Sequence, residues 1–387
     1  MEYEKLFKKE GYYNINWEYV ESIPEFAKLK ECEQNPKWHS EGNAWEHTMK
    51  CVHAAYTLIL DEMYNGLDPR IAIAAVLFHD IGKGVTTEFL KGNWHAYGHE
   101  FAGEKIARRL LWDVPMPIRE VICACARWHM KVLNMATSKN VVNEILGMSR
   151  IPYANWRYLT FVKYCDILGS VQEDVDSKCN DIHKIHSIYN IANKLGVLDR
   201  KFTLDYEEQR RMVFSPNKAW KADIDDIPIV YVLIGLPGAG KNTWIERYLF
   251  EFLRADEENG LEDTVILSRD DIRSELGFCN DGDKVVLSPD KENEVSKVFN
   301  ERFVKALNED KDVVLNNVNL KKRYRDDFKR LAGNRLIDWQ YVYIEAPTIE
   351  DNIKRRPTFD PEVLMSMRET LEWPQPDEYD KLLILKQ

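Results

Sequence analysis

The stretch Ile227-Pro-Ile-Val-Tyr-Val-Leu-Ile-Gly-Leu-Pro-Gly-Ala-Gly-Lys-Asn-Thr243 decides the fold of the second half of this chain. Its β-branched and apolar run, residues 229–234, predicts a strand buried on both faces of a parallel sheet. A glycine-rich turn ending in Lys241 follows at once, and a helix is expected from about Thr243. This is the context of a Walker A loop, in which backbone N–H groups and a helix start surround phosphates. The stretch therefore predicts a site for ATP or another nucleoside triphosphate with Mg²⁺.

One position of the loop departs from the Walker pattern. Lys241 is followed by Asn242, where a serine or threonine hydroxyl normally ligates Mg²⁺. An amide oxygen can ligate this ion, but less ideally. The residues expected to hold the nucleotide in the loop and helix start are Gly235, Gly238, Ala239, Gly240, Lys241, Asn242 and Thr243.

Three further apolar runs, at 264–267, 313–315 and 341–344, alternate with helical stretches. Strand and helix in alternation predict a doubly wound α/β domain with a parallel sheet. Before it, residues 45–195 have apolar side chains at helical spacing, and the acidic stretch 222–228 breaks that pattern. We therefore expect an all-α domain (1–195), a connecting region (196–226) and an α/β domain with a C-terminal lid (227–387).

Polar side chains follow two of the predicted strands. Asp270 lies at the mouth of the sheet, where it could accept a proton from an incoming hydroxyl, and the alternative is an acidic helix N-terminus. Arg273, three residues on, could hold a substrate phosphate or Asp270 itself. Asn317 stands where many P-loop kinases have an acid, and Arg355 and Arg356 suit a lid over the transferring phosphate.

Polar residues also stand on apolar helix faces in the first half. An apolar helix ends in His79 and Asp80, and His47, His129 and Asp166 each share a face with apolar residues. Burying such groups is costly unless they have partners, and a divalent cation suits imidazole and carboxylate together. A hydrogen-bonded core group is the alternative for any one of them. Their number in one helical domain favours a metal site.

These residues belong to ordered motifs: Asn43-Ala-Trp-Glu-His47-Thr, Phe78-His-Asp-Ile-Gly-Lys83, Tyr97-Gly-His-Glu100 and then Asp166. Over about residues 38–170 the set resembles the HD phosphohydrolase superfamily, and in particular the HD domains found in bacterial CCA-adding enzymes. The resemblance implies an all-helical domain that binds a divalent transition metal such as Mn²⁺, Ni²⁺ or Co²⁺. The implied ligands are His47, His79, Asp80 and Asp166, with His99 and His129 at a second metal in some members. The acids Asp174, Asp176 and Asp181, a few residues downstream, are alternatives to Asp166 as the last ligand.

Lys83 lies just past the His-Asp pair and could neutralise a phosphate oxygen, although a helix-end lysine in water is the alternative. A bound metal would lower the pKa of a water and polarise a phosphoryl oxygen. The remaining histidines are interpreted as structural or surface residues: His39, His53, His95, His183 and His186.

A second resemblance rests on the motifs Gly235-Leu-Pro-Gly-Ala-Gly-Lys-Asn-Thr-Trp244, Ser268-Arg-Asp-Asp-Ile-Arg273, Asn316-Asn-Val-Asn-Leu320 and Lys354-Arg-Arg356. Over about residues 228–375 they resemble the phage-type 5′-hydroxyl polynucleotide kinase domain. The resemblance implies transfer of the NTP γ-phosphate to a 5′-OH nucleic-acid end, with Asp270 as base and Arg273 near the acceptor. It implies that Lys241 stabilises the phosphoryl group and that the arginines after Lys354 serve as lid residues.

An HD domain ahead of such a kinase resembles a bacterial and phage RNA-repair fusion. That resemblance implies that the first half clears a 2′,3′-cyclic phosphate or a 2′- or 3′-phosphate and the second phosphorylates the 5′-OH. The partners would be RNA or DNA ends, with a separate RNA ligase to seal them. Two alternatives remain: a small-molecule nucleoside or nucleotide kinase fused to an HD nucleotidase, and a nucleotide-sensing HD hydrolase with an inactive kinase half.

The amino-acid composition restricts the class of protein. The 387 residues are 44% hydrophobic and 30% charged, which is typical of a soluble globular protein. A net charge of −11 argues against loose binding to nucleic acid, although the basic run 321–325 could form a local site. The seven cysteines lack a zinc-knuckle spacing, and no signal peptide or membrane-spanning stretch is evident. We therefore expect a cytoplasmic enzyme without a membrane partner.

Overall fold

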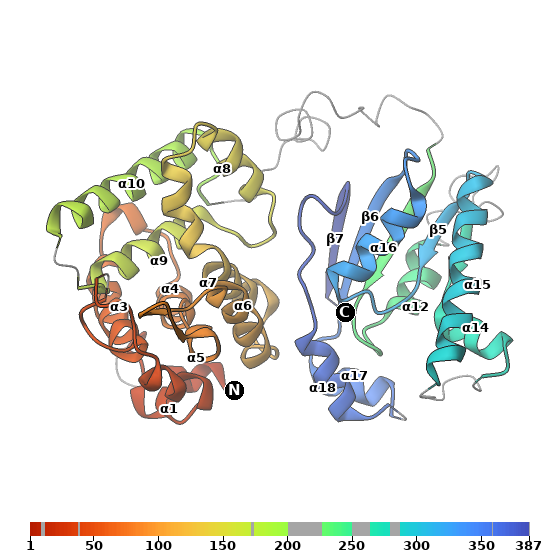
Figure 1. The fold of residues 1–387 in the computed structure, drawn as a ribbon, viewed down its shortest axis with the longest axis horizontal. Helices are drawn as coiled ribbons and strands as arrows, with labels where there is room; N and C mark the ends of the chain where they lie inside the picture. The colour runs from red at the N-terminus through yellow and green to blue at the C-terminus, as the bar shows by residue number, and fades with distance from the viewer. Residues whose placement is uncertain are drawn as a thin grey trace. The chain divides into compact units, whose positions relative to one another are not determined.

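The chain divides into two compact units, Met1–Ser215 and Pro216–Gln387, in this computed structural model (Figure 1). The structure describes residues 1–8, 12–37, 39–171, 174–199, 227–249, 264–278, 287–357 and 359–386. Most of the predicted connecting region, from residue 200 to 226, lies outside these ranges. None of the described helices is long and apolar enough to cross a bilayer.

The first unit is helical. Its main helices are α3 (Ala44–Leu58), α4 (Pro69–Phe78), α6 (His99–Leu110), α7 (Met116–Ala136), α8 (Val141–Ser149), α9 (Trp156–Gly169) and α10 (Val175–Lys194). Its short helices are η1 (Tyr3–Leu6), α1 (Trp17–Glu21), α2 (Pro24–Ala27), η2 (Lys28–Glu31), η3 (Glu62–Tyr64) and α5 (Lys83–Thr86). The fold class predicted for this half is confirmed.

Helix α4 forms the centre of the first unit. It starts at an Asp68 cap with Pro69 in its first turn, and every residue from Ala72 to Phe78 is buried. A helix that is apolar all round is a core helix, and α3, α7 and α9 pack around this one. Whatever follows Phe78 is therefore placed in the middle of the domain.

A small hairpin departs from the all-helical prediction. Strands β1 (Glu88–Leu90) and β2 (Asn93–His95) pair antiparallel. Lys91 and Gly92 join them with φ angles of 52° and 81°, and two positive angles in succession suit the twist of a two-residue hairpin. The hairpin directly precedes α6.

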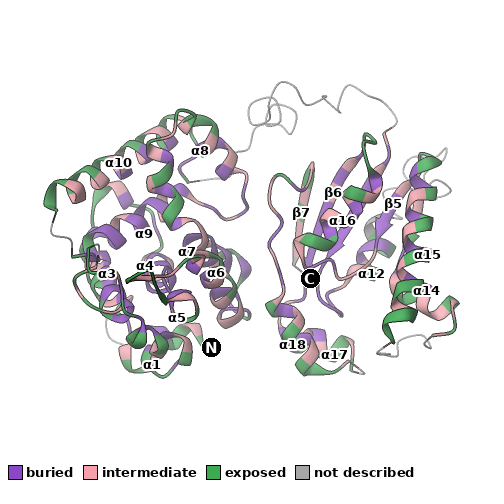
Figure 2. Cartoon of the chain, in the orientation of Figure 1, coloured by how far each residue is buried: buried purple, intermediate pink, exposed green. Residues whose placement is uncertain are grey.

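The second unit contains a five-stranded parallel sheet in the order β4-β5-β3-β6-β7. Its strands are β3 (Ile229–Ile234), β4 (Thr264–Leu267), β5 (Asp312–Leu315), β6 (Asp338–Glu345) and β7 (Lys381–Lys386). Its helices are α12 (Lys241–Trp244), η5 (Ile245–Leu249), α14 (Arg269–Glu275), α15 (Pro289–Asn308), α16 (Lys322–Ala332), α17 (Ile349–Arg355) and α18 (Pro361–Glu369). Figure 2 shows that burial concentrates on the central strands, whereas α15 keeps an exposed face. The predicted α/β fold is confirmed, and β7 at the edge is an additional strand.

The carboxyl ends of β3 and β5 lie side by side at one edge of this sheet. Asn319 fixes their spacing, because its buried amide donates to the carbonyls of Leu233 and Leu315 over 2.8 and 3.1 Å. Ligands of open α/β sheets bind at this edge, where the glycine-rich loop begins.

Candidate metal centre and nucleotide site

All six predicted metal ligands of the first unit converge on one place in its core. They come from α3 (His47), the residues after α4 (His79 and Asp80), the first turn of α6 (His99), α7 (His129) and α9 (Asp166). Each is buried. Helices far apart in the sequence thus deliver imidazoles and carboxylates to a common point.

Three of the imidazoles are oriented by the backbone. Each donates its Nδ1–H to the carbonyl three residues earlier: His79 to Val76 (2.7 Å), His99 to Ala96 (2.8 Å) and His129 to Ala126 (3.0 Å). A carbonyl can only accept, so the proton lies on Nδ1 and the Nε2 lone pair remains available. Such a second bond is the usual way to orient a histidine that binds metal.

The Nε2 atoms gather around the carboxylate of Asp80. Its Oδ2 lies 3.3 Å from His79 and 3.6 Å from His47, and its Oδ1 lies 3.3 Å from His99 and 3.7 Å from His129. Asp166 joins the first pair, with Oδ1 at 3.1 Å from His47. The two oxygens of Asp80 therefore face two separate groups of donors.

The donor set fits a divalent metal ion. The Nε2 of His79 and the Oδ1 of Asp80 are buried, and neither has a hydrogen-bond partner among the described residues. Leaving such atoms unpaired costs free energy unless a ligand satisfies them. Imidazole nitrogens with carboxylate oxygens suit the transition metals of the borderline class.

Two buried lysines neutralise the carboxylates. The Nζ of Lys83 lies 2.6 Å from Asp80 and donates to Gln34 over 2.7 Å, and Lys163 lies 2.5 Å from Asp166. Burial alone would raise the pKa of each carboxyl, but the neighbouring ammonium groups hold both well below their usual range. Burial likewise opposes the charge of Lys83, yet Asp80 raises its pKa. The interpretation of Lys83 as a helix-end lysine in water is therefore wrong.

The histidines differ in their tendency to take up a proton. Burial lowers the pKa of His99, and it lowers that of His129 well below the usual range, so both stay neutral, as ligation requires. Burial also acts to lower the pKa of His47, but Cys51 and the bond to Asp166 outweigh it and raise that pKa well above its usual value. A metal at His47 must therefore displace a proton.

Glu41 is a site residue that the sequence analysis missed. Its Oε1 accepts from His47 Nδ1 and from His39 Nδ1, each over 2.8 Å, and its Oε2 accepts from the Val171 amide over 2.8 Å. Glu41 thus orients His47, and His39 belongs to this network. Glu41 lies in a loop, where no periodicity marks a residue as inward.

Cys51 and Lys163 were missed for another reason. The Cys51 sulfur lies 3.4 Å from His47 Nε2, and Lys163 bonds Asp166. Each stands on a helix at i+4 or i−3 from a predicted ligand, so spacing could have indicated both.

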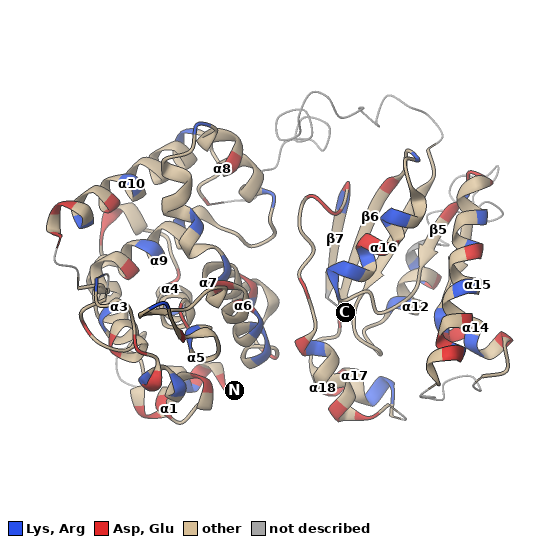
Figure 3. Ribbon diagram, in the orientation of Figure 1, with Lys and Arg blue, Asp and Glu red and all other residues tan. Residues whose placement is uncertain are grey.

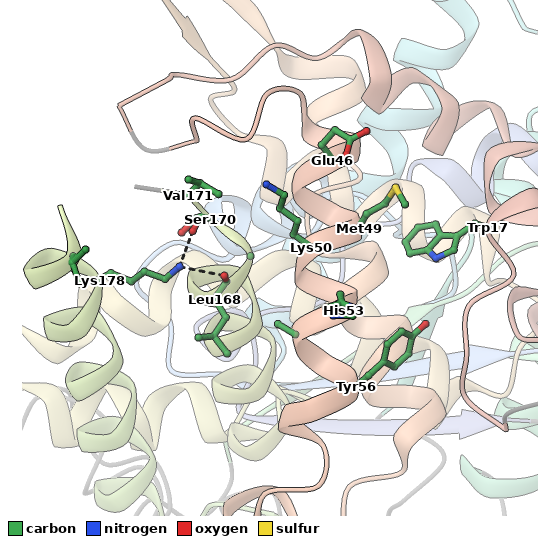
Figure 4. Close-up of a pocket in the computed structure, with 13 residues that line it drawn as sticks. Trp17, Glu46, Met49, Lys50, His53, Tyr56, Leu168, Ser170, Val171 and Lys178 are labelled. Atoms are coloured by element: carbon green, nitrogen blue, oxygen red, sulfur yellow. Dashed lines mark hydrogen bonds between the residues drawn. The ribbon is translucent and has the colours of Figure 1, made fainter. Parts of the chain in front are cut away.

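A pocket of about 700 Å³ opens elsewhere in the first unit (Figure 4). Met49, His53 and Tyr56 of α3 line it, and Trp17 lies beside them. None of the six metal-type residues contributes to it. In Figure 4 the ammonium of Lys178 is bonded back to the carbonyls of Leu168 and Ser170. The pocket is therefore distinct from the metal centre.

In the second unit the glycine-rich loop has the predicted form. Gly238 and Gly240 have φ angles of 77° and 102°, which favour glycine, and a Cβ on Gly238 would lie 2.7 Å from the Asn352 carbonyl. Lys241 donates to the carbonyls of Gly235 and Leu236 over 2.9 and 3.1 Å. Burial and the nearby positive charge of Arg356 lower the pKa of Lys241 to about 8. Ala239 lies within the loop, and Thr243 follows in α12.

Two asparagines meet at the mouth of the sheet. Asn316 donates its amide to the Oδ1 of Asn242 over 3.0 Å. Asn317 instead accepts from the backbone N–H of Arg269 over 3.0 Å. The residue beside Asn242 is therefore Asn316, one position before the one singled out from the sequence. Neither amide of the pair carries the charge that binds Mg²⁺ strongly.

Asp270 and Arg273 lie in the first turns of α14, which is capped by Ser268. Arg273 donates to Asp270 over 2.6 Å and pairs with Glu292 of α15 at 2.9 Å. The carboxylate of Asp270 remains largely exposed and free to approach a substrate. Arg273 was predicted to hold either a substrate phosphate or Asp270, and in the structure its guanidinium contacts Asp270.

Helix α17 packs on the glycine-rich loop. Asn352 donates to the Pro237 carbonyl over 2.9 Å, and Arg355 donates to that of Gly238 over 3.4 Å. Arg356 follows Arg355 directly and acts electrostatically on Lys241. The predicted lid arginines thus lie at the phosphate loop.

The basic run 321–325 does not form one basic surface. Arg325 is fully buried and pairs with Glu378 at 2.7 Å. Lys322 has acidic neighbours at Asp326 and Asp377. Figure 3 shows acidic and basic positions interspersed along α14, α15 and α16.

Comparisons with known proteins agree with this division. The family model of the HD domain matches residues 44–160, and a family model described as an AAA domain matches residues 230–374. Multifunctional CCA protein of Halorhodospira halophila is 35% identical over 111 residues, which are 28% of this chain and 24% of that protein. Multifunctional CCA protein of Actinobacillus pleuropneumoniae serotype 5b is 36% identical over 155 residues, 39% of this chain and 35% of that protein. The matches thus span about a third or less of the length of these relatives. The chain combines a helical HD domain with a P-loop kinase-like domain.

Proposed function

We propose, from an HD-type hydrolase domain and a P-loop kinase-like domain on one chain, that this protein heals both ends of a broken RNA. The HD domain would hydrolyse a 2′,3′-cyclic phosphate or a terminal 2′- or 3′-phosphate, and the kinase domain would phosphorylate the 5′-OH. Sealing would fall to a separate RNA ligase. The observation that carries the proposal is the convergence of four imidazoles and two carboxylates in a chain that also has a phosphate-binding loop.

In the HD domain, His47, His79, Asp80 and Asp166 would hold a divalent cation. When bound, the cation supplies an activated water and polarises a phosphoryl oxygen. Lys83 is the protein's own contribution, because its fixed ammonium can neutralise a phosphate oxygen next to Asp80. Water adds to phosphorus, one P–O bond to the ribose breaks, and the released ribose oxygen takes up a proton.

In the kinase domain, Lys241 would bind the outer phosphates of the nucleotide and Asp270 would accept the proton of the 5′-OH. Arg273 orients Asp270 through its 2.6 Å hydrogen bond. The 5′ oxygen bonds to the γ-phosphorus as the β–γ bridging bond breaks. Arg355 and Arg356 are placed to offset the charge of the transferring group.

An RNA with both ends unhealed tests the proposal. An oligoribonucleotide with a 5′-OH and a 2′,3′-cyclic phosphate is incubated with labelled ATP and Mn²⁺, Ni²⁺, Co²⁺ or Mg²⁺. Wild type is compared with Asp80→Ala, Asp270→Ala and Asp176→Ala, the last an exposed acid of α10. Each of the first two variants serves as the folding control of the other.

Asp80→Ala should slow the reaction at the 3′ end alone, and Asp270→Ala that at the 5′ end alone, each by roughly 10³-fold or more. Asp176→Ala should behave as wild type. No change at either end with any metal would refute RNA healing. Labelling of free nucleosides without labelling of the RNA would indicate a small-molecule kinase instead.

The Asn242–Asn316 hydrogen bond favours a second candidate, an HD hydrolase regulated by a kinase half that binds nucleotide without turnover. Two neutral amides replace the hydroxyl and acid that usually hold Mg²⁺ at this position. Steady-state ATP consumption with the RNA acceptor separates the candidates. Turnover that Lys241→Ala abolishes would exclude a purely regulatory role.

A further inference from the structure

A buried cysteine lies among the donor atoms of the metal centre. Cys51 follows His47 by one turn of α3, and both side chains are fully buried. The Sγ of Cys51 lies 3.4 Å from the Nε2 of His47. This sulfur and one donor atom from each of His47, His79 and Asp166 all lie within 4.8 Å of one another. Cys51 therefore belongs to the centre through its contacts, on the side that faces the Oδ2 of Asp80.

The packing of α9 on α3 confines the sulfur to this position. The two helices lie against each other (Figure 1), and a Cβ on Gly169 of α9 would overlap the Cys51 sulfur and lie 2.7 Å from its backbone nitrogen. Gly169 stands one turn after Asp166, whose main-chain oxygen lies 4.0 Å from the same sulfur. The thiol is thus held between the backbone of α9 and the imidazole of His47.

The spacing of the donors suits a common ion. Bonds of about 2.0–2.3 Å at right-angled or tetrahedral positions keep neighbouring donor atoms about 2.8–3.6 Å apart. From the Nε2 of His47 the distances are 3.1 Å to Asp166 Oδ1, 3.4 Å to Cys51 Sγ and 3.6 Å to Asp80 Oδ2. The Nε2 of His79 lies 3.3 Å from Asp80 Oδ2, and 3.9 Å from Asp166 Oδ1, as donors on more nearly opposite sides of an ion would. The sulfur therefore lies at the distance of a ligand atom.

An unsatisfied nitrogen beside the sulfur points to a ligand. The Nε2 of His79 is buried and has no hydrogen-bond partner among the described residues, although the Cys51 sulfur lies within 4.8 Å. A buried polar atom of this kind calls for an ion or another partner. In the described part of the chain, the second group of donors, Asp80 with His99 and His129, includes no cysteine. The sulfur thus distinguishes the two sides of the centre.

We propose that Cys51 is a further ligand of the metal centre and binds the ion as a thiolate, so that the centre selects a sulfur-seeking ion such as Zn²⁺ or Co²⁺ over Mn²⁺. The ion takes the place of the thiol proton, which passes to solvent. Thiolate ligands favour the softer ions, whereas carboxylates and water suit Mn²⁺ and Mg²⁺. This inference rests on the metal centre of the proposed function and specifies the class of ion that this centre holds.

The first test titrates the full-length chain, freed of metal with a chelator, with Co²⁺ and records its absorption. A thiolate bound to Co²⁺ gives an intense charge-transfer absorption in the near ultraviolet, whereas imidazole and carboxylate donors do not. Wild type should show this absorption, and Cys51→Ala should abolish it. Cys125→Ala is the matched control and should retain it, because Cys125 is a buried cysteine of α7 that belongs to none of the groups of metal-type residues.

The second test compares the affinities of Zn²⁺ and Mn²⁺ by calorimetric titration of wild type and Cys51→Ser. Serine keeps the size of the side chain and replaces the sulfur by oxygen. The variant should bind Zn²⁺ roughly tenfold or more less tightly, with a loss of about threefold or less for Mn²⁺, because only the softer ion depends on the thiolate. A cysteine that merely fills space between α3 and α9 would instead affect both ions alike.

Absence of the absorption from wild type, or its persistence in Cys51→Ala, would overturn Cys51 as a ligand, and so would equal losses for the two ions in Cys51→Ser. The outcome is separable from that of the proposed function. If the absorption depends on Cys51 while no RNA 3′ end is hydrolysed, the healing of RNA fails and the ligand stands. Hydrolysis of the RNA without this absorption would give the reverse.

Discussion

Replacing Glu41 by glutamine should weaken metal binding at His47 without removing a metal ligand. Glu41 has no exposed side-chain surface, and its Oε1 accepts from His47 and His39 while its Oε2 accepts from the Val171 amide. Glutamine is isosteric but turns one acceptor into a donor. Whichever way the amide is oriented, at least one buried N–H then faces another donor.

The magnitude follows from those contacts. Substituting a residue that orients a metal ligand typically costs 10- to 100-fold in metal affinity, or about 1.4–2.7 kcal/mol. If the glutamine oxygen remains toward the histidines, Val171 loses its acceptor and the loss should be near tenfold. If the amide nitrogen turns toward them, the orientation of His47 is lost and the effect should approach 100-fold.

Calorimetric titration of the full-length chain with Mn²⁺ or Co²⁺ measures this effect. Glu46→Gln is the matched control, since Glu46 is an exposed carboxylate of α3 directly before His47. An affinity of Glu41→Gln within twofold of wild type, with Glu46→Gln alike, would refute the role of Glu41 in orienting the metal centre.

Three further outcomes are expected. Lys241 has a pKa of about 8 in the free chain, so its ammonium is charged below that pH. Because bound phosphates favour the charged form, nucleotide affinity should fall by up to about tenfold per pH unit above pH 8. Binding titrations at pH 7–10 would measure this fall. Gly82→Ala should lower the free energy of unfolding by about 1–3 kcal/mol in denaturant melts, because its Cβ would lie 1.9 Å from the carbonyl oxygen of His99. Gly103→Ala is the control and should be tolerated, because the nearest atom to its Cβ lies at 3.4 Å. Removing metal with a chelator should destabilise the first unit by about 2.7 kcal/mol relative to metal at 100 times its Kd, and calorimetric scans of Asp80→Ala should show no such dependence.

Local patterns predicted the parts of each site that a single segment encodes. Helix α4 is apolar and buried from Ala72 to Phe78, so the burial of the His79-Asp80 pair that follows it could be predicted from this run. The run 229–241 specifies a strand, a turn and a helix start in succession, so the position of its glycines in a phosphate-binding loop could be predicted.

Contacts between segments that are distant in the sequence were harder to predict. Glu41 reaches His47 from a loop, and nothing in its neighbours indicates that it faces inward. At the end of β5, the difference between Asn316 and Asn317 is one residue, and adjacent residues of a strand point to opposite faces. Arg325 belongs to a basic run, yet its fixed partner Glu378 lies 53 residues away. Hydropathy and charge along the chain do not determine such pairings.

The charges of the metal centre explain why it should bind both a cation and a phosphate ester. Three buried carboxylates (Glu41, Asp80 and Asp166) lie with two buried lysines, which leaves one negative charge before any proton on a histidine is counted. The raised pKa of His47 supplies the compensating proton in the metal-free chain, because an uncompensated buried charge is costly. A divalent cation that displaces this proton changes the balance from neutral to one positive charge. The same exchange that admits the metal would therefore favour the anionic phosphate of the proposed substrate, and ionisation of Cys51 would offset part of that attraction.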